Sequence, residues 1–214
     1  MSNHITHVSQ RWSNSEQDSV ELSAPDLNWP GRFLSEAIAL QSTLGSAFPH
    51  VIHHVGSTAV PGLAAKPIID IILEVPNPHD WPSLIEPLQQ LGYGYWADNP
   101  DTDTMFFVKG MPPFGVGRTH HIHVLTPNAT QPKLRFRDYL IAHDDEARRY
   151  EALKRDLVVK YRYDRDGYTN AKSEYIQQVL RTAEKECSNP LSILRTDNTY
   201  QHGCMHEIAI FGVR

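Results

Sequence analysis

The chain has 214 residues, of which 40% are hydrophobic and 21% charged, a composition typical of globular proteins rather than disordered ones. Its formal net charge of −5 argues against broad nonspecific binding to a nucleic-acid backbone, and no apolar stretch approaches the roughly 20 residues that a membrane-spanning helix needs. The polar N-terminus lacks a signal-peptide core, and the two cysteines form no paired motif. We therefore expect a cytoplasmic protein without a membrane segment or a strong nucleic-acid signature.

Composition divides the chain into three parts. Residues 1–24 are rich in Ser, Asn, Gln and His with little apolar periodicity, which predicts a flexible N-terminal arm. Residues 25–186 carry regular apolar patterns and form the predicted domain. Residues 187–214 mix turn formers with a short apolar end, and we expect them to form a C-terminal tail.

The first half of the domain alternates helices and strands. Pro30 suits a helix start, and the apolar spacing after it predicts a helix that ends near Gly45. A short strand is expected at residues 51–55, and a strand rich in β-branched residues at 68–75. The segment between them, residues 57–67, contains a Pro-Gly turn signal and can hold at most a short helix.

A helix is predicted over residues 77–92, followed by two strands with the sequences TMFFVKG and HHIHVL. The final third is helical, in the segments 133–143, 144–161 and 168–186. The stretch DRDGYT between the last two helices is predicted to be a loop. Strands in the middle, with helices before and after them, favour a mixed α/β (α+β) domain over a doubly wound parallel sheet.

One acidic residue stands inside an apolar strand, IIDIILEV. Period-two alternation puts Asp70, Ile72 and Glu74 on one face of this strand. Because burying a bare carboxylate is costly, we expect Asp70 to point into a site. Gly56 and Ser57 precede it by about a dozen residues, and successive N–H groups beside a glycine can cradle phosphate oxygens. The pattern indicates a phosphate-binding loop next to a metal-binding aspartate.

The run HVGSTAVPGLAAKPIIDI closely resembles the signature of the GrpB family, and FRDYLIAH, ARRYEALKRDLVVKY and YTNAKSEYI are further matching motifs. Together the resemblance covers roughly residues 28–182. It implies a branch of the nucleotidyltransferase superfamily, with a DNA polymerase beta-like fold in which a mixed sheet is flanked by helices. A related domain, fused to bacterial dephospho-coenzyme A kinase, is regarded as a folding accessory.

The resemblance implies roles for several positions. Gly56 and Ser57 match the phosphate-binding loop, and Thr58 beside them is a further expected contact to phosphate or nucleotide. Asp70 matches the first metal-binding carboxylate. The second carboxylate would stand two residues later, where this chain has Ile72. The motif is therefore half of a nucleotidyltransferase signature.

The other expected metal ligands are not carboxylates. Glu74 lies one step further along the strand face, too far from Asp70 to share an ion without distortion. Where the superfamily has a third carboxylate, this chain has His121 and His123, which alternate onto one strand face. We expect a divalent metal, Mg or Mn, and a set of one Asp and two His makes Zn or Fe an alternative. Both histidines are explained equally well as half-buried strand residues.

Three basic residues are candidates for contacts to an anion. Lys66, between the two halves of the motif, can reach a phosphate or pair with the nearby aspartate. Arg118 follows a glycine-rich loop, a common placement for an anion contact or for the same pairing. Lys172 lies in YTNAKSEYI and is expected to touch the ligand. By contrast, the charges of EARRYEALKRD predict a solvated helix face with pairs such as Glu151 with Arg155.

Three functional hypotheses follow. The first is a nucleotidyltransferase-like enzyme that binds a nucleoside triphosphate and a divalent metal, with Asp70, Lys66 and Arg118 as catalytic residues. The second is a folding-accessory or interaction domain with a degenerate site and a protein partner, which Ile72 favours. The third is a metal-dependent enzyme of another class that uses Asp70 with the two histidines. The expected ligand is a nucleotide or another small molecule.

Overall fold

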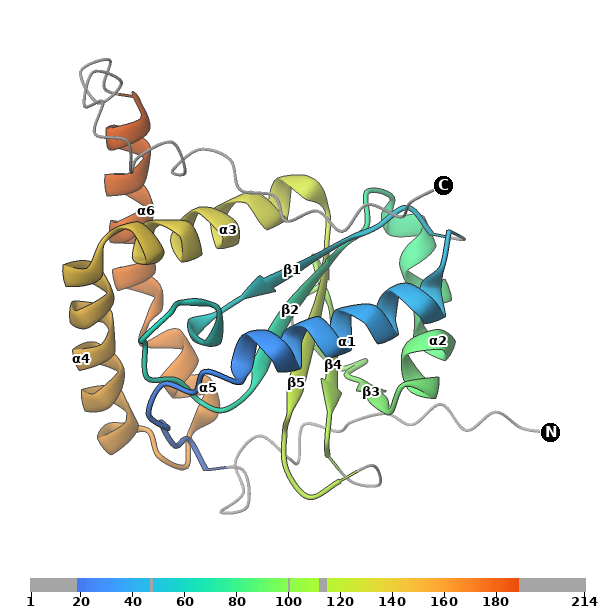
Figure 1. The fold of residues 1–214 in the computed structure, drawn as a ribbon, viewed down its shortest axis with the longest axis horizontal. Helices are drawn as coiled ribbons and strands as arrows, with labels where there is room; N and C mark the ends of the chain where they lie inside the picture. Colours follow the sequence, from blue (N-terminus) through green and yellow to red (C-terminus); the bar gives the residue numbers. More distant parts are fainter. Residues whose placement is uncertain (1–18, 47, 100, 112–114, 189–214) are drawn as a thin grey trace.

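The computed structural model describes residues 19–46, 48–99, 101–111 and 115–188, which form a five-stranded sheet with helices packed against it (Figure 1). The strand order is β1-β2-β5-β4-β3, with β2 and β5 parallel and all other neighbours antiparallel. The strands are Val51–Val55 (β1), Ile69–Glu74 (β2), Tyr93–Tyr95 (β3), Met105–Lys109 (β4) and His120–Leu125 (β5). This mixed sheet flanked by helices confirms the predicted α/β, nucleotidyltransferase-like fold.

One face of the sheet packs against α1 (Trp29–Leu44) and α2 (Ile85–Gln90). Pro30 lies in the first turn of α1, where its missing N–H breaks no hydrogen bond. Gly45 ends the helix with a φ of 56°, which residues other than glycine rarely adopt. The main hydrophobic core lies between these helices and the sheet, and its fully buried members include Leu40, Ile71, Leu88, Phe107 and Ile122.

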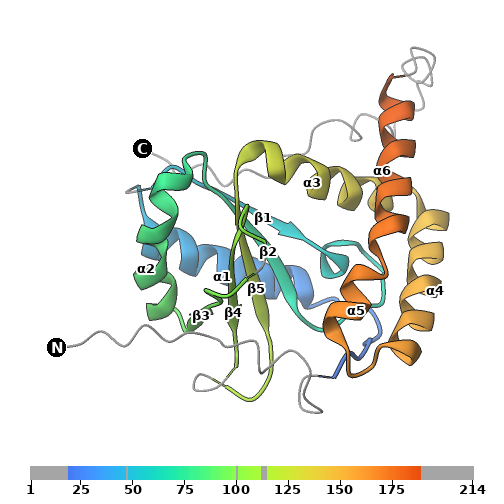
Figure 2. The same ribbon diagram turned by 180° about the vertical axis from the view of Figure 1, so that it is seen from behind.

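Four helices follow the last strand: α3 (Pro127–Ala142), α4 (Asp144–Lys160), α5 (Arg165–Asn170) and α6 (Ser173–Ser188). They gather at one end of the sheet, away from α2 (Figures 1 and 2). Acidic residues fill the first turn of α4 and Lys160 stands in its last turn, which complements the helix dipole.

The C-terminal helices share a second, smaller hydrophobic core. Leu140 of α3 and Tyr150 of α4 are buried there, together with the partly buried Ile176 of α6. Val60 and Leu63, from the segment between β1 and β2, belong to the same cluster. That segment therefore joins the sheet to the helices, and the predicted phosphate-binding loop lies at the junction.

β2 alternates as its sequence predicts. Ile69, Ile71 and Leu73 belong to the main core, whereas Ile72 belongs to a separate small cluster with Val55 and Leu125, against which α3 packs. Asp70 and Ile72 thus share the face of the sheet that looks toward the C-terminal helices.

Two expectations about the elements are wrong. The predicted loop at residues 164–169 contains α5, because the Asp164 side chain accepts a hydrogen bond from the Gly167 N–H at 2.8 Å and starts a helical turn. The helix predicted over residues 77–92 begins as a 3₁₀ helix, Pro78–Leu84, and becomes α-helical only at α2. Pro82 lies inside the 3₁₀ segment and cannot donate an N–H to a regular α-helix.

The described chain is anchored ahead of the predicted domain start. The predicted N-terminal arm up to residue 18 and the predicted tail from residue 189 lie outside the described residues. Val20 is buried, and its N–H donates to the carbonyl oxygen of Arg162 at 2.8 Å. Ser23 pairs with Ala65 in an isolated antiparallel bridge. Among the described residues, no helix is long and apolar enough to cross a membrane.

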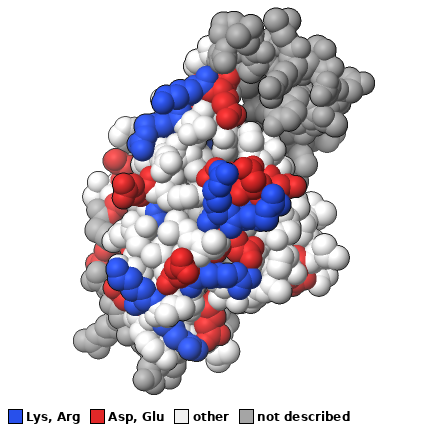
Figure 3. All heavy atoms as spheres, turned by 90° about the vertical axis from the view of Figure 1, so that its left-hand side faces the viewer, with Lys and Arg blue, Asp and Glu red and all other residues white. Residues whose placement is uncertain are grey.

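The side of the molecule that carries α4 and α6 shows basic and acidic side chains interspersed (Figure 3). On α4, Arg149 pairs with Asp145 at 3.1 Å, and Arg155 pairs with Glu151 at 2.7 Å, as the sequence predicts for the latter pair. Such exposed pairs contribute only about 0.2–1 kcal/mol each to stability. The described part of this side therefore carries no broad patch of one sign.

Candidate functional site

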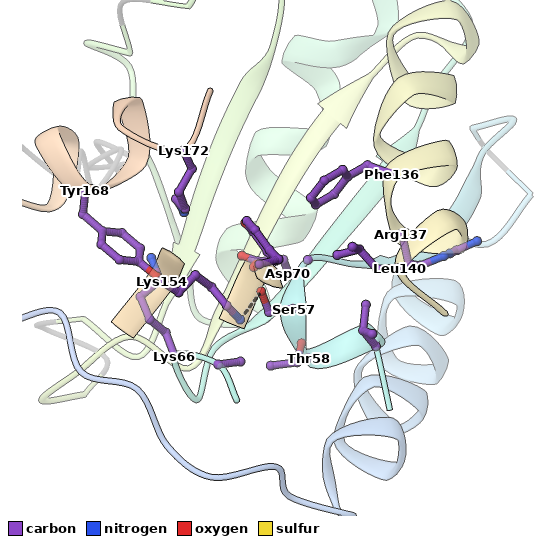
Figure 4. A pocket seen from close by; sticks show the side chains of 14 residues that line it. Ser57, Thr58, Lys66, Asp70, Phe136, Arg137, Leu140, Lys154, Tyr168 and Lys172 are labelled. Carbon is purple, nitrogen blue, oxygen red and sulfur yellow. Dashed lines mark hydrogen bonds between the residues drawn. The ribbon is translucent and has the colours of Figure 1, made fainter. Parts of the chain in front are cut away.

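A pocket of about 110 Å³ opens between the sheet and the C-terminal helices (Figure 4). Its walls come from the loop after β1, from β2, from α3 and α4, and from the α5–α6 region. A single bound water needs only about 10–15 Å³, so the pocket admits a ligand of several atoms. It is lined by six of the residues that the sequence predicts for the site: Gly56, Ser57, Thr58, Lys66, Asp70 and Lys172.

Gly56 brings the loop backbone against the carboxylate of Asp70. Its φ of 72° lies in the left-handed region that favours glycine. A Cβ atom at this position would lie 2.4 Å from Asp70 Oδ2, well inside van der Waals contact. The residue must therefore be glycine for two reasons, its backbone conformation and the close approach of Asp70.

Ser57 and Thr58 begin a 3₁₀ turn, Ser57–Ala59, but their hydroxyl groups differ in availability. Ser57 is half-buried, and its Oγ accepts a hydrogen bond from Lys154 and also hydrogen-bonds to the Tyr150 side chain, so it lines the pocket as part of a polar network. Thr58 is buried, with Oγ1 3.0 Å from His54 Nε2 and 3.4 Å from the Ile68 carbonyl oxygen. The Thr58 hydroxyl therefore stabilises the loop from within.

Asp70 pairs with His121 across the parallel β2–β5 register. The His121 Nδ1 donates to Asp70 Oδ1 at 2.9 Å. Burial alone would raise the pKa of Asp70, but this hydrogen bond and the charge of Lys66 hold it well below its usual range, so the carboxylate is ionised. Burial lowers the pKa of His121 to about 4, which keeps the ring neutral at pH 7. The Asp70 side chain keeps 29% exposure toward the pocket.

Lys66 and Lys172 both approach the ring of Tyr168. Their Nζ atoms lie 5.5 and 4.3 Å from the ring centre, and neither ammonium group has a hydrogen-bond acceptor among the described residues. Burial, reinforced by the charge of Arg165, lowers the pKa of Lys66 to about 7. Burial lowers the pKa of Lys172 to about 8, although the charge of Asp70 opposes the shift. Two crowded cations without acceptors point to a place for an anion.

Lys154 is a site residue that the sequence pattern misses. The solvated face predicted for EARRYEALKRD is wrong at this position, because Lys154 is only 2% exposed. Its Nζ donates to Ser57 Oγ at 3.1 Å and to the Ala64 carbonyl oxygen. Burial lowers its pKa to about 7, although Glu151 opposes the shift. The available signal was the spacing of four residues from the buried Tyr150, which puts both on one helix face.

Glu151 and Lys154 together fix the end of the loop segment. Glu151 Oε2 accepts from the Ala64 N–H at 2.9 Å, while Lys154 donates to the carbonyl oxygen of the same residue. Both backbone groups of Ala64 are therefore held by α4. Lys154 uses one N–H donor on Ala64 and a second on Ser57, which leaves the third N–H donor for the pocket.

The wall opposite the lysines is largely apolar (Figure 4). Phe136 and Leu140 lie one turn apart on α3 and line the pocket, and Phe136 packs edge-on against Tyr150 with ring centres 5.2 Å apart. Arg137 also lines the pocket, but its guanidinium pairs with Asp138 at 2.6 Å and donates to a backbone carbonyl of β1. The pocket is therefore cationic on one side and apolar on the other.

The donors expected for a metal do not assemble. Among the described residues, no group of three or more His, Cys, Asp or Glu side chains is placed to hold a metal ion. Ile72 is fully buried, Glu74 pairs with His53 at 3.5 Å, and His123 packs against an aromatic ring of β4. Within this set, Asp70 Oδ1 accepts the hydrogen bond from His121, and Oδ2 lies against Gly56. These residues fit neither a two-metal site nor an Asp-His-His site.

Three predicted residues are outside the described pocket lining: His121, His123 and Arg118. His121 acts through Asp70, and burial lowers the pKa of His123 to about 3, so that ring is neutral. Arg118 is close enough for its charge to lower the pKa of Lys66, although burial is the larger cause. It therefore adds positive potential beside the lysines without facing the cavity.

The fold is nucleotidyltransferase-like, and the pocket sets three lysines beside Asp70 and the loop at Gly56 and Ser57. The chain belongs to the GrpB family, because the family model described as GrpB protein matches residues 19–182. This confirms the family that the motif from His54 to Ile71 predicts. The match also extends further toward the N-terminus than the predicted domain, in agreement with the anchored residues Val20 and Ser23.

Individual relatives agree with this assignment. A UPF0157 protein of Pseudomonas aeruginosa is 49% identical over 183 residues, which are 85% of this chain and 75% of that protein. The dephospho-CoA kinase of Mycolicibacterium paratuberculosis is 31% identical, over 77% of this chain but only 46% of the kinase. The crystal structure of conserved protein GrpB from Enterococcus faecalis has a TM-score of 0.68 and 30% identity, covering 79% of this chain and 100% of that one.

Proposed function

We propose that this GrpB-family protein binds a nucleoside triphosphate, or a similar organic polyphosphate, with its phosphate groups in the pocket between the sheet and the C-terminal helices. The observation that carries the proposal is the group of three lysines, Lys66, Lys154 and Lys172, that face one carboxylate. Burying ammonium groups is costly unless an anion compensates them. Phosphate oxygens accept several such donors at once.

The loop supplies the complementary contacts to phosphate. Gly56 exposes the backbone, the Ser57 hydroxyl lines the pocket, and the first N–H groups of the 3₁₀ turn have no acceptor within the turn. Ser57 lies across the pocket from Lys172 and Tyr168, so a phosphate group can be held between the loop and Lys172 (Figure 4).

The apolar wall favours an organic ligand over a free inorganic anion. Phe136 and Leu140 offer no donors, and an inorganic phosphate would leave the partly exposed ring of Phe136 in contact with water. A nucleoside, or another group with a flat or apolar part, buries this wall at about 25 cal/mol per Å² of apolar surface. We therefore expect a nucleotide to bind more tightly than inorganic triphosphate.

Thermal unfolding of the full-length chain with ATP, CTP, GTP, UTP and inorganic triphosphate tests the proposal. At a hundredfold excess over its Kd, a ligand specific for the native state adds about 2.7 kcal/mol of stability. For a chain of this length that corresponds to a rise in Tm of roughly 5–10 °C. An unchanged Tm with every nucleotide and with triphosphate contradicts the proposal.

Two lysine variants give the matched comparison. Lys172→Met removes an ammonium group of the pocket and is expected to weaken binding by about 1.5–3 kcal/mol, the usual strength of a charge-assisted hydrogen bond. Lys160→Met removes an exposed lysine of α4 and should leave the affinity unchanged. Equal losses in both variants would mean that binding depends on overall charge rather than on the pocket.

A second candidate is a non-catalytic accessory or interaction domain. Two observations favour it: Ile72 is fully buried where nucleotidyl transfer needs its second carboxylate, and the matched dephospho-CoA kinase contains this region as less than half of its length. We expect binding without turnover in this case. Incubation with labelled nucleoside triphosphate tests this candidate, since release of pyrophosphate, with the nucleotidyl group passed to water or to the protein itself, would contradict the accessory role.

A further inference from the structure

We infer that the lysines of the pocket, and not a divalent metal, neutralise the bound phosphates, so that this chain binds its polyphosphate ligand without Mg²⁺. The inference rests on the proposed function and concerns how the same pocket compensates the charge of its ligand. It departs from what the superfamily resemblance implies, and it follows from the residues that actually line the site.

The charges that line the pocket already suit a polyphosphate. Among the described lining residues, four are basic and one, Asp70, is acidic. Arg137 is compensated by its pairing with Asp138 at 2.6 Å. The three lysines face the remaining carboxylate alone, so an added divalent cation meets repulsion, whereas a polyphosphate meets attraction.

The donors of the lysines are arranged to meet one ligand. Lys66 comes from the loop segment, Lys154 from α4 and Lys172 from the turn between α5 and α6, and all three line the same cavity. Lys66 and Lys172 have no hydrogen-bond acceptor among the described residues, and Lys154 has one donor left. Three ammonium groups from three elements can thus contact different oxygens of a polyphosphate chain.

The carboxylate is poorly placed to recruit a metal. Asp70 Oδ1 accepts the hydrogen bond from His121, and Oδ2 lies against the backbone of Gly56. Mg²⁺ demands near-octahedral oxygen coordination and commonly uses one or two carboxylates together with waters and phosphates. The second carboxylate position is Ile72, which is fully buried between Val55 and Leu125. The pocket therefore offers a metal one carboxylate, whose two oxygens both have protein neighbours, beside three lysines.

Isothermal titration of the full-length chain with ATP and with inorganic triphosphate, each in EDTA and in Mg²⁺ buffer, tests the inference. We expect the Kd of each probe to agree between the two buffers within about threefold. A loss of affinity beyond about tenfold in EDTA would overturn the inference and leave the proposed function standing. No binding of either probe in either buffer would overturn the proposed function and this inference together.

Asp70→Asn should change the affinity for ATP in opposite directions, depending on whether the lysines or a metal ion neutralise the phosphates. Asparagine keeps an acceptor for His121 but removes the single acidic charge of the described lining, so ATP should bind at least about threefold more tightly in EDTA. A metal ligand would instead lose affinity in Mg²⁺ buffer on this substitution, and that outcome would overturn the inference.

Lysine variants keep the test decisive if Asp70→Asn fails to fold. Lys66→Met and Lys172→Met should each weaken ATP binding by about tenfold or more, by the same factor in EDTA and in Mg²⁺ buffer. Lys160→Met, on the exposed face of α4, should change neither value. Losses that appear only in EDTA would show that Mg²⁺ replaces the lysines and would overturn the inference.

Discussion

At the scale of single residues, Gly56 and Asp70 depend on each other. The carboxylate sits where a side chain of residue 56 would be, and the loop backbone covers one of its oxygens. Asp70 is ionised although it is surrounded by protein, because His121 donates to it and Lys66 stands nearby. The aspartate inside the apolar strand is therefore compensated by hydrogen bonding and charge together.

Gly56→Ala should be more destabilising than Gly62→Ala. Both residues have a positive φ, 72° and 74°, so each alanine suffers backbone strain, of about 1–3 kcal/mol at residue 56, whose ψ of −173° lies in a region that essentially only glycine adopts. Only residue 56 also meets Asp70, whereas a Cβ at residue 62 has nothing within 4 Å. Urea unfolding should show an extra loss of about 1–3 kcal/mol for Gly56→Ala. Equal losses for the two variants would mean that the loop moves away from Asp70 freely.

The sequence predicts the local part of the site and, through the motif YTNAKSEYI, the distant Lys172, but it misses Lys154. Gly56, Ser57 and Asp70 lie in one motif, where turn chemistry and strand alternation apply directly. Lys154 bonds to Ser57 from 97 residues away, and this contact depends on how α4 packs against the loop. Within EARRYEALKRD, a charged residue on the buried face looks the same as its solvated neighbours, so periodicity alone cannot identify it.

At the scale of elements, β2 explains why residue 72, where the superfamily resemblance implies a second carboxylate, is an isoleucine. Alternation puts Asp70 at the edge of the pocket and Ile72 two residues on, beneath α3, where it packs with Val55 and Leu125. The same face of β2 thus changes from polar at residue 70 to apolar at residue 72. A carboxylate at residue 72 would face this cluster instead of the cavity.

Ile72→Asp should lower the free energy of unfolding by about 3–5 kcal/mol, because it buries an unpaired charge. Ile72→Val is the matched control and should cost about 0.5–1.5 kcal/mol, the loss of one methylene from the cluster. Urea unfolding of both variants measures the difference. If Ile72→Asp cost less than about 1 kcal/mol, packing would not explain why the second carboxylate is absent.

The short elements mark the limit of prediction from sequence patterns. β3 has only three residues, Tyr93–Tyr95, too few for an alternation to be recognised, and its pairing with β4 comes from the fold. α5 forms in DRDGYT because the Asp164 side chain caps it, while its glycine and aspartates read as loop formers. The longer strands and the helices α1 and α4 are confirmed, whereas α3 begins at Pro127, ahead of the predicted start at residue 133.

At the scale of the whole molecule, the pocket lies where two cores meet. The main core joins the sheet to α1 and α2, and the smaller one joins α3, α4 and α6 to the loop segment through Val60 and Leu63. A ligand between the loop and the lysines contacts both units. Binding is therefore expected to stabilise the junction as well as to compensate charge.

The lysines also make the stability of the whole molecule depend on pH. In the unfolded chain each lysine has its ordinary pKa of 10.5, whereas burial in the fold lowers the pKa of Lys66 and Lys154 to about 7 and that of Lys172 to about 8. Between these values the unfolded chain binds more protons than the folded one, so the free energy of unfolding rises with pH. The surrounding charges act in both directions, since Asp70 and Glu151 raise these pKa values, and three arginines lower them: Arg118, Arg155 and Arg165.

Without ligand, the free energy of unfolding should therefore rise by at least about 1 kcal/mol from about pH 7 to about pH 9, as measured by urea unfolding. Lys172→Met should reduce the rise, because methionine has no proton to lose, and the exposed Lys160→Met should not. Saturating triphosphate should flatten or reverse the trend, since a bound anion returns the lysine pKa values toward 10.5. If the free energy of unfolding instead fell steadily over this range, burial would not be destabilising the protonated lysines, and a bound anion would have no such destabilisation to relieve.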